Sequence, residues 1–431
     1  MPSPINGSAG GTRRLNAIRW TLILHMNIAR QLEIIADRAV DLVSRDELQR
    51  KLEKSIAQNK PLRIKYGADP SAPDIHLGHV VGLKKLREFQ DLGHTVVFII
   101  GDFTAMIGDP SGRSETRKPL SRAEVAANAS TYQEQVFRVL DKSKTEVRFN
   151  SEWCSALSFD NVLKLTARLT VAQLLARDDF QKRFRENHPI SVVEFLYPII
   201  QGYDSVMVKA DLEIGGTDQL FNLLVGRDLQ KAFGQEQQVV LTLPLLEGLD
   251  GVKKMSKSLG NYIGISEPPR EIFGKVMSIP DELMWRYFSL VLCRKESEVE
   301  NLRKDVAAGQ RHPRDVKDGL AGEIVAMFHG KDKARASSEE FARIFSGHKL
   351  PDEIATAKIP ANSLKNGRMG IVALLAAAGL AESKSAARRL VQQGAVKIDG
   401  QKITDIEAEI AVGNENILQA GKRGIVRLEI I

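Results

Sequence analysis

The chain has 431 residues, of which 43% are hydrophobic and 27% charged, and it carries a formal net charge of +7. This length predicts two or three domains with ample core, and the composition is that of a globular protein. Two cysteines exclude a disulfide framework and indicate a reducing compartment, so we expect a cytoplasmic protein. No apolar run approaches the ~18 residues of a membrane span, and the basic charge favours a polyanionic partner.

The amino-terminal segment differs in composition from the rest of the chain. Residues 1–32 include four arginines and no acidic residue, and residues 20–28 form an apolar patch. Targeting peptides share this composition, but the patch is short and no small-residue cleavage site follows it. We interpret residues 1–32 as a leader outside the folded domains, with Met26 as an alternative start of translation.

From residue 62 to about residue 265, apolar β-branched runs alternate with stretches of helical periodicity. The predicted strands are residues 62–66, 95–100, 146–149, 211–214 and 238–243, and the predicted helices are residues 122–140, 192–209 and 219–233. This alternation predicts an α/β fold with a mostly parallel sheet covered by helices. Ligands of such sheets bind at the carboxyl ends of the strands.

Residues 67–79 form a Gly/Pro/Asp loop between the first strand and a helix that we predict to begin near Gly78. The first amides of a helix have no internal partners and bind anions, and Gly78 permits close approach to the backbone. His76 and His79 would point into this site. Taken alone, the pattern is more often an ordinary strand–turn–helix. Zinc would need a third ligand, and because no histidine or cysteine lies nearby we expect no protein-bound metal.

A second stretch, residues 253–260, combines lysines and serines with a glycine and lies far down the chain. Alone, a lysine-rich loop is usually a solvated surface. Together, and at opposite ends of one α/β segment, the two stretches resemble the HIGH and KMSKS signatures of class I aminoacyl-tRNA synthetases. The resemblance implies a Rossmann-like, doubly wound catalytic domain over residues 33–269. It also implies that His76, His79, Lys254 and Lys257 act on the phosphates of ATP.

Residues Tyr197, Gln201 and Asp204 share one helix face by their i, i+4 and i+7 spacing. Such a face is either the wet side of a helix or the wall of a ligand cleft. The segment resembles the tyrosine-binding helix of tyrosyl-tRNA synthetases. In that family Asp204 would accept the phenolic hydroxyl, while Tyr197 and Gln201 would hold the α-amino group.

The same resemblance assigns further positions in the segments 101–113 and 215–219. It implies that Thr104 and Asp109 help to bind the amino group and that Gln219 lies near the substrate carboxyl group. It places Arg113 and Arg117 at the pyrophosphate. The residues implied in ATP binding are Asp69, Ser71, Gly78, Gly216, Asp218, Met255 and Ser256.

One position departs from the family pattern, because some members place a tyrosine where this chain has Lys65. In those members the tyrosine makes a second hydrogen bond to the substrate hydroxyl group. The sequence does not show which residue makes that second contact here, so selectivity for the hydroxyl group would depend on Asp204. The alternatives are a tryptophanyl-type synthetase of the same class and a non-catalytic RNA-binding protein that retains the fold.

In the carboxy-terminal third, the predicted secondary structure changes twice along the chain. Residues 270–348 read as wholly helical, residues 349–367 as a linker, and residues 368–431 as short helices and strands. The run 383–396 resembles the S-four-type RNA-binding module, a small α+β domain. Ser385, Arg388, Arg389 and Lys397 would then make salt-sensitive phosphate contacts.

The resemblance as a whole implies a tyrosyl-tRNA synthetase reaction. Tyrosine and ATP, accompanied by Mg²⁺, would form tyrosyl-adenylate and pyrophosphate, and tyrosine would pass to the 3′-terminal adenosine of tRNA(Tyr). It further implies a homodimer with residues 122–190 at the interface, and a helical domain 270–348 that faces the anticodon stem.

Overall fold

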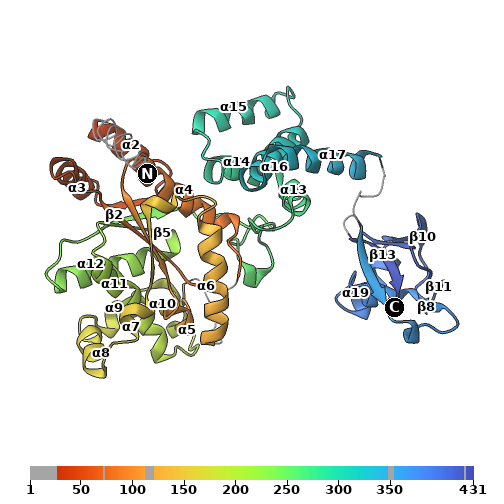
Figure 1. Ribbon diagram of the computed structural model, residues 1–431, viewed down its shortest axis with the longest axis horizontal. Helices are drawn as coiled ribbons and strands as arrows, with labels where there is room; N and C mark the ends of the chain where they lie inside the picture. Colours follow the sequence, from red (N-terminus) through yellow and green to blue (C-terminus); the bar gives the residue numbers. More distant parts are fainter. Residues whose placement is uncertain (1–26, 71–72, 112–120, 348–353, 422–423) are drawn as a thin grey trace, which may run out of the picture. The chain divides into compact units, whose positions relative to one another are not determined.

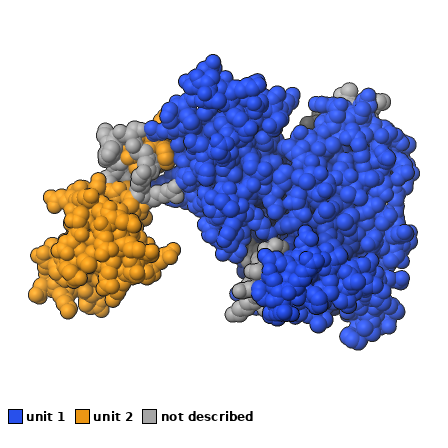
Figure 2. All heavy atoms as spheres, turned by 180° about the vertical axis from the view of Figure 1, so that it is seen from behind, with its two compact units in different colours: residues 1–337 blue, residues 338–431 orange. Residues whose placement is uncertain are grey.

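The computed structural model describes residues 27–70, 73–111, 121–347, 354–421 and 424–431 (Figure 1). By its internal contacts the chain divides into two compact units, residues 1–337 and 338–431 (Figure 2). None of the described helices has a stretch both long and apolar enough to traverse a lipid bilayer.

The first unit is built on a six-stranded sheet with the strand order β1-β6-β5-β2-β3-β4. The strands are β1 (Asp41–Val43), β2 (Arg63–Ala68), β3 (Thr95–Ile100), β4 (Thr145–Phe149), β5 (Leu212–Gly216) and β6 (Val239–Leu243). All neighbours are parallel except β1, which pairs antiparallel with β6. The predicted α/β fold with a mostly parallel sheet is therefore confirmed.

The order of the strands reverses between β2 and β5. From β2 the chain proceeds outward through β3 to β4, and it then returns to the other side of β2 to form β5 and β6. Two residue pairs, Ile64 with Leu212 and Lys65 with Glu213, join β2 to β5. Crevices at such reversal points are where doubly wound sheets bind ligands, because the flanking loops leave in opposite directions.

Helices cover the sheet on both sides (Figure 1). Those of the amino-terminal half are α2 (Ile28–Ala36), α3 (Arg45–Ala57), α4 (Leu77–Asp91), α5 (Thr104–Ile107) and α6 (Arg122–Val136). Between β4 and β6 lie α7 (Ser151–Cys154), α8 (Phe159–Thr166), α9 (Val171–Leu175), α10 (Asp178–Arg185), α11 (Leu196–Val208) and α12 (Leu220–Ala232). Short 3₁₀ turns are η1 (Lys142–Lys144), η2 (Val192–Phe195), η3 (Thr217–Gln219) and η4 (Lys257–Leu259).

The segment from residue 28 to residue 57 forms two helices and a short strand. Strand β1 separates α2 from α3, and Ser44 begins α3 with a capping box in which its side chain accepts from the Glu47 amide. A capping box favours a new helix start at this serine, because it satisfies amides that otherwise lack partners.

The segment after the sheet is helical, as predicted. It comprises α13 (Pro269–Met277), α14 (Asp281–Leu290), α15 (Glu296–Ala307), α16 (Pro313–His329) and α17 (Lys331–Gly347). The boundary between the two compact units falls within α17, between residues 337 and 338.

The second unit has a five-stranded sheet, β10-β9-β12-β13-β7, and a two-stranded sheet, β11-β8. Its elements are β7 (Ala355–Ile359), η5 (Ala361–Ser363), β8 (Arg368–Gly370), α18 (Ile371–Ala377), α19 (Lys384–Gln392), β9 (Val396–Ile398), β10 (Gln401–Ile403), β11 (Glu409–Ala411), β12 (Ile417–Ala420) and β13 (Gly424–Ile430). Strand β7 pairs parallel with β13, so the expectation that residues 349–367 form only a linker is wrong from residue 355 onward. Sequence reasoning missed β7 because its pairing partner lies some seventy positions later in the chain.

Candidate active site

A cavity of about 840 Å³ opens beside the carboxyl ends of β2 and β5, within the first unit. Its wall contains residues from both signature stretches and from α11, although these lie far apart in the sequence. The predicted site residues that line it are Asp69, His76, Gly78, His79, Thr104, Asp109, Tyr197, Gln201, Asp204, Gly216, Asp218, Gln219, Lys254, Met255, Ser256 and Lys257. One cavity thus brings together groups suited to a phenol, an ammonium group and phosphates.

Asp204 forms the buried end of this wall, with a relative exposure of 3%. Its Oδ1 accepts a hydrogen bond from Trp153 Nε1 at 2.8 Å, and Asn150 Nδ2 lies 3.4 Å from its Oδ2. Burial raises the pKa of Asp204 to about 7, while nearby Lys65 and the two hydrogen bonds oppose the rise. A carboxylate held in this way can accept a further hydrogen bond from a hydroxyl group in the cavity.

Asp69, at the end of β2, connects α5 to α11. Its Oδ1 accepts from Thr104 Oγ1 at 2.7 Å, and its Oδ2 accepts from the Tyr197 hydroxyl at 3.0 Å. Gly101 is needed beside this contact, since a Cβ there would lie 2.1 Å from Asp69 Oδ1. Because the Tyr197 proton is directed at Asp69, the lone pairs of its hydroxyl oxygen are available to a donor such as an ammonium group.

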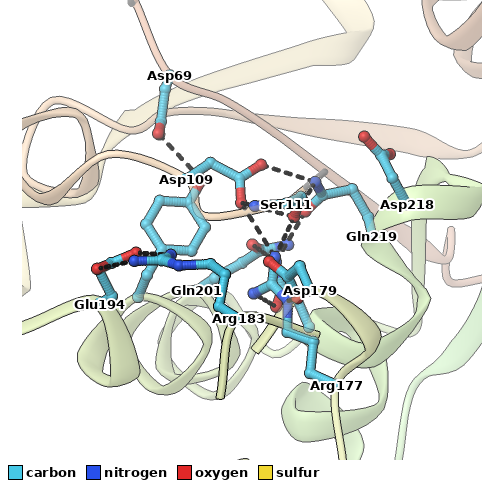
Figure 3. Close-up of polar contacts among 12 residues, drawn as sticks. Asp69, Asp109, Ser111, Arg177, Asp179, Arg183, Glu194, Gln201, Asp218 and Gln219 are labelled. Carbon is cyan, nitrogen blue, oxygen red and sulfur yellow. Dashed lines mark hydrogen bonds and ion pairs between the residues drawn. The ribbon is translucent and has the colours of Figure 1, made fainter. Parts of the chain in front are cut away.

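A polar network continues the wall from Asp109 to Gln201 (Figure 3). Asp109 Oδ1 accepts from Ser111 Oγ at 2.6 Å, and its Oδ2 accepts from Gln219 Nε2 at 2.8 Å. Asn222 Nδ2 donates to Gln219 Oε1 at 2.9 Å and to Gln201 Oε1 at 3.1 Å. Carboxylate and amide oxygens therefore converge where an ammonium group could bind.

Lys65 is fully buried behind α11 and does not line the cavity. Its Nζ lies 2.8 Å from Glu213 Oε1 and donates to Gln201 O and Ser205 Oγ, both at 2.7 Å. Lys65, the residue that departs from the family pattern, therefore connects β2 and β5 to the backbone of α11. It occupies the interior side of the helix face that carries Gln201 and Asp204.

His76 and His79 lie at the start of α4, with their ring centroids 3.9 Å apart. Burial lowers the pKa of His79 to about 4, and the charge of Lys257 adds to this effect. Burial, His79 and Lys257 likewise hold the pKa of His76 well below its ordinary value. Both rings are therefore neutral at pH 7, and among the described residues Nδ1 of His76 has no hydrogen-bond partner. Neutral imidazoles can act here as hydrogen-bond donors or acceptors.

The lysine-rich loop folds over the cavity. Lys254 Nζ lies 2.7 Å from Asp218 Oδ2, and Lys257 Nζ donates to the carbonyl oxygen of Asp74. Burial lowers the pKa of Lys257 to about 8, with Asp74 opposing the shift. Met255 between them is buried, and its amide donates to Leu246 O at 2.8 Å. The loop therefore brings two cations to the side of the cavity that carries Asp218 and the histidines.

Several predicted residues lie elsewhere. Ser71, Arg113 and Arg117 lie outside the described residues. In the second unit, Ser385, Arg388 and Arg389 are exposed on α19, and Lys397 is half-buried on β9. Ala387 and Val391 bury the opposite face of α19, so the basic side chains stand on a fixed helix.

The site also contains residues that the sequence analysis did not select: Asn150, Trp153, Arg177, Glu213 and Asn222. Asn150 and Trp153 follow the end of β4, so the rule that sites lie at the carboxyl ends of strands could have identified them. Arg177 follows no strand and belongs to no motif, so no signal in the sequence could have identified it.

Two family models match the chain. One, described as tRNA synthetases class I (W and Y), matches residues 57–346. The other, described as the tyrosine--tRNA ligase SYY-like C-terminal domain, matches residues 352–423. Between them they cover most of both compact units.

Similar proteins carry the same description. The tyrosine--tRNA ligase of Moorella thermoacetica is 55% identical over 405 residues, which are 94% of this chain and 97% of that protein. The tyrosine--tRNA ligase of Geobacter sulfurreducens is 52% identical over 403 residues, with 94% and 99% of the two chains covered.

Two solved structures share the fold. The tyrosyl-tRNA synthetase of Archaeoglobus fulgidus, complexed with L-tyrosine, aligns with a TM-score of 0.58 and 24% identity over 72% of this chain and all of that one. A truncated mitochondrial tyrosyl-tRNA synthetase from Aspergillus nidulans aligns with a TM-score of 0.60 and 22% identity, over 77% of this chain and all of that one.

Proposed function

The chain belongs to the tyrosine–tRNA ligases of the class I aminoacyl-tRNA synthetases, and on that premise we propose roles for the residues of its cavity. The enzyme activates tyrosine with ATP, releases pyrophosphate, and transfers tyrosine from tyrosyl-adenylate to the 3′-terminal adenosine of tRNA(Tyr). The observation that carries the proposal is that Asp204, the two histidines and the two loop lysines line one cavity of about 840 Å³. That volume lies within the range of small-molecule sites.

At the tyrosine end, the substrate phenol donates a hydrogen bond to the carboxylate of Asp204. Trp153 and Asn150 keep this carboxylate in place through the hydrogen bonds that they donate. The α-ammonium group meets only oxygen atoms, from Asp109, Tyr197 and Gln201, with Thr104 ordering Asp69 behind them. Phenylalanine cannot donate to Asp204, so its binding would exclude water from this buried carboxylate without supplying the hydrogen bond that the phenol provides.

At the nucleotide end, the substrate carboxylate attacks the α-phosphorus of ATP and the bond to pyrophosphate breaks. The carboxylate is already a nucleophile at neutral pH, so this step needs no general base. Neutral His76 and His79 donate hydrogen bonds to phosphate oxygens, and Lys257 stabilises the charge that develops on pyrophosphate. Asp218, paired with Lys254 in this structure, takes the ribose when ATP binds and releases Lys254 to the phosphates. Asp69, Gly78, Gly216, Met255 and Ser256 complete the nucleotide side.

Magnesium accompanies ATP in this proposal and is held by phosphate oxygens and water. The described residues include no cluster of three or more His, Cys, Asp or Glu side chains placed to hold a metal ion.

We further propose that the protein is a cytoplasmic homodimer. Helices α8, α9 and α10 and turn η2 leave large apolar side chains exposed, among them Phe159, Leu163, Val171, Phe184 and Val192. A contiguous exposed apolar patch usually marks a protein interface, and we propose that these side chains form one. The helices of residues 270–348 face the anticodon stem, and the basic residues of α19 and β9 contact tRNA phosphates.

The function is tested by amino-acid-dependent exchange of pyrophosphate into ATP. Exchange with tyrosine and none with tryptophan is expected. Exchange with tryptophan would favour the tryptophanyl alternative, and binding of tRNA without any exchange would favour a non-catalytic RNA-binding protein.

A further inference from the structure

Arg177 is a buried arginine beside the substrate cavity, at the N-cap position of α10. It does not line that cavity, whereas Asp109, Ser111, Gln201 and Gln219 do. Any effect of Arg177 on a bound amino acid must therefore pass through other residues.

Arg177 donates in three directions. Its Nη2 donates to Ser111 Oγ at 2.6 Å, its Nη1 donates to Asn222 Oδ1 at 3.0 Å, and its Nε lies 2.7 Å from Asp179 Oδ1. Figure 3 shows Arg177 beside two of these partners, Ser111 and Asp179. A guanidinium group has donors and no acceptor, so each partner must present an oxygen to it.

This constraint sets the direction of the hydrogen bond at Ser111. Its oxygen accepts from Arg177 and also from Gln219 Nε2 at 3.0 Å. The hydroxyl proton of Ser111 is then directed at Asp109 Oδ1, 2.6 Å away. Arg177 Nη2 also lies 3.6 Å from the same carboxylate oxygen.

The same constraint orients the amide of Asn222. Because its Oδ1 accepts from Arg177, its NH₂ group faces the amide oxygens of Gln201 and Gln219. Gln219 in turn presents its nitrogen to Asp109. If the Asn222 amide were reversed, its oxygen would face Gln201, and the Gln201 amide would have to present its NH₂ group to Asn222 in place of its oxygen.

We propose that Arg177 is a positioning residue for the α-ammonium group of tyrosine. Through Ser111 and Asn222 it fixes the direction of the hydrogen bonds, so that the ammonium group meets the oxygens of Asp109 and Gln201. This inference deepens the proposed function and rests on it, because it takes the amino-group site of that proposal as given.

The test compares two ligands on the full-length protein: tyrosine, and 3-(4-hydroxyphenyl)propionate, which lacks the amino group. In the Arg177→Gln variant we expect tyrosine to bind ~10- to 100-fold more weakly, as loss of charge-assisted hydrogen bonds implies. The affinity for the analogue should change by less than about threefold, because it makes no use of the ammonium site. KM for tyrosine should rise in the exchange assay while KM for ATP stays constant.

Arg183→Gln is the matched control. Arg183 is also buried on α10, but its guanidinium group pairs with Glu194 at 2.6 Å (Figure 3). This variant should lose folding stability and keep the wild-type ratio of the two affinities. The proposal would be overturned if Arg177→Gln weakened the binding of tyrosine and of the analogue equally. It would also be overturned if Arg183→Gln changed the ratio of the two affinities as much as Arg177→Gln does.

A second variant keeps the test decisive if Arg177→Gln does not fold. Asn222→Ala removes the amide that transmits the orientation, and Asn222 itself does not line the cavity. This variant should also lower the affinity for tyrosine relative to the affinity for the analogue, and an unchanged ratio of the two affinities would overturn the proposal. A wild-type protein that binds both ligands equally would instead contradict the amino-group site of the proposed function.

Discussion

Asp204 titrates close to neutral pH, because burial raises its pKa to about 7. Only the ionised carboxylate is an acceptor at both oxygens, so the fraction competent to receive the phenol falls as the pH falls. We predict that tyrosine binds about tenfold more weakly at pH 6 than at pH 8, following the ionised fraction. Calorimetric titration of the ATP-free protein measures this, and His79, with a pKa of about 4, stays neutral throughout.

Asp204→Asn is the control for this pH dependence. Its tyrosine affinity should be lower than that of the wild type and flat between pH 6 and pH 8. A wild-type affinity that does not change over this range would mean that Asp204 is not the acceptor of the phenol.

The Lys65–Glu213 pair is an ion pair inside the core, with side-chain exposures of 0% and 1%. Removal of one partner leaves the other charge buried and uncompensated, which typically costs ~3–5 kcal/mol. We predict a loss of this size in the free energy of unfolding for Lys65→Met. Replacement of both partners, Lys65→Met with Glu213→Met, should recover most of it. Urea denaturation measures both variants, and a double variant no more stable than the single one would contradict this account.

At the scale of residues, sequence reasoning identified what lies in motifs and missed what supports them. Asp204 could be selected because the i, i+4, i+7 spacing reveals a shared helix face. Arg177 could not, because its significance depends on the hydroxyl group of Ser111 and the amide of Asn222 that it contacts after folding. Lys65 could be recognised in the sequence because it departs from the family pattern. Its partner Glu213 could not be predicted, since the pairing of β2 with β5 joins positions 148 residues apart.

The loop that includes Lys254 and Lys257 makes contacts that the phosphates of a bound nucleotide can replace. Lys257 donates to a backbone carbonyl in this structure, an interaction that a phosphate can replace. We predict that Lys257→Ala lowers the rate of tyrosyl-adenylate formation by ~10²- to 10³-fold, since it removes a charge placed for the transition state. Tyrosine affinity should change by less than about twofold, because the lysine lies at the nucleotide end.

Lys253→Ala is the matched control, because Lys253 is exposed in the same loop and does not line the cavity. Single-turnover measurement of adenylate formation distinguishes the two lysines. Equal losses in adenylation rate and in tyrosine affinity for Lys257→Ala would count against its role at the transition state.

At the scale of elements, strands buried on both faces were the easiest to predict. Strand β3 is a continuous apolar run, and all its residues after Thr95 are buried. Strand β1 was missed, because three residues between two amphipathic helices give no periodic signal and its stability comes from pairing with β6. The short helices α7 to α10 lack long periodic stretches, and their boundaries depend on local caps such as Ser158 and Thr170.

At the scale of the molecule, the cavity lies in the first compact unit, and the basic residues proposed to contact tRNA phosphates on α19 and β9 lie in the second. We predict that Arg388→Ala and Arg389→Ala each weaken tRNA binding and reduce the slope of log K against log salt by about 0.7 to 0.9, because each removes one phosphate contact. Tyrosine-dependent pyrophosphate exchange should stay at the wild-type rate, since it takes place in the first unit.

Arg427→Ala is the control for nonspecific loss of charge, because Arg427 lies on β13 and pairs with Glu415 at 2.5 Å. Filter binding at several salt concentrations gives the slopes. A slope that Arg388→Ala and Arg389→Ala leave unchanged would remove these residues from the RNA contact.

The central claim is that one cavity holds the whole aminoacyl nucleotide, and a crystal structure with a sulfamoyl analogue of tyrosyl-adenylate tests it most directly. The account predicts that the phenolic oxygen lies within hydrogen-bond distance of the Asp204 carboxylate. It also predicts that the sulfamoyl group faces His79 and the loop that carries Lys257. An analogue bound with its phenol away from Asp204, or outside the cavity, would contradict the account.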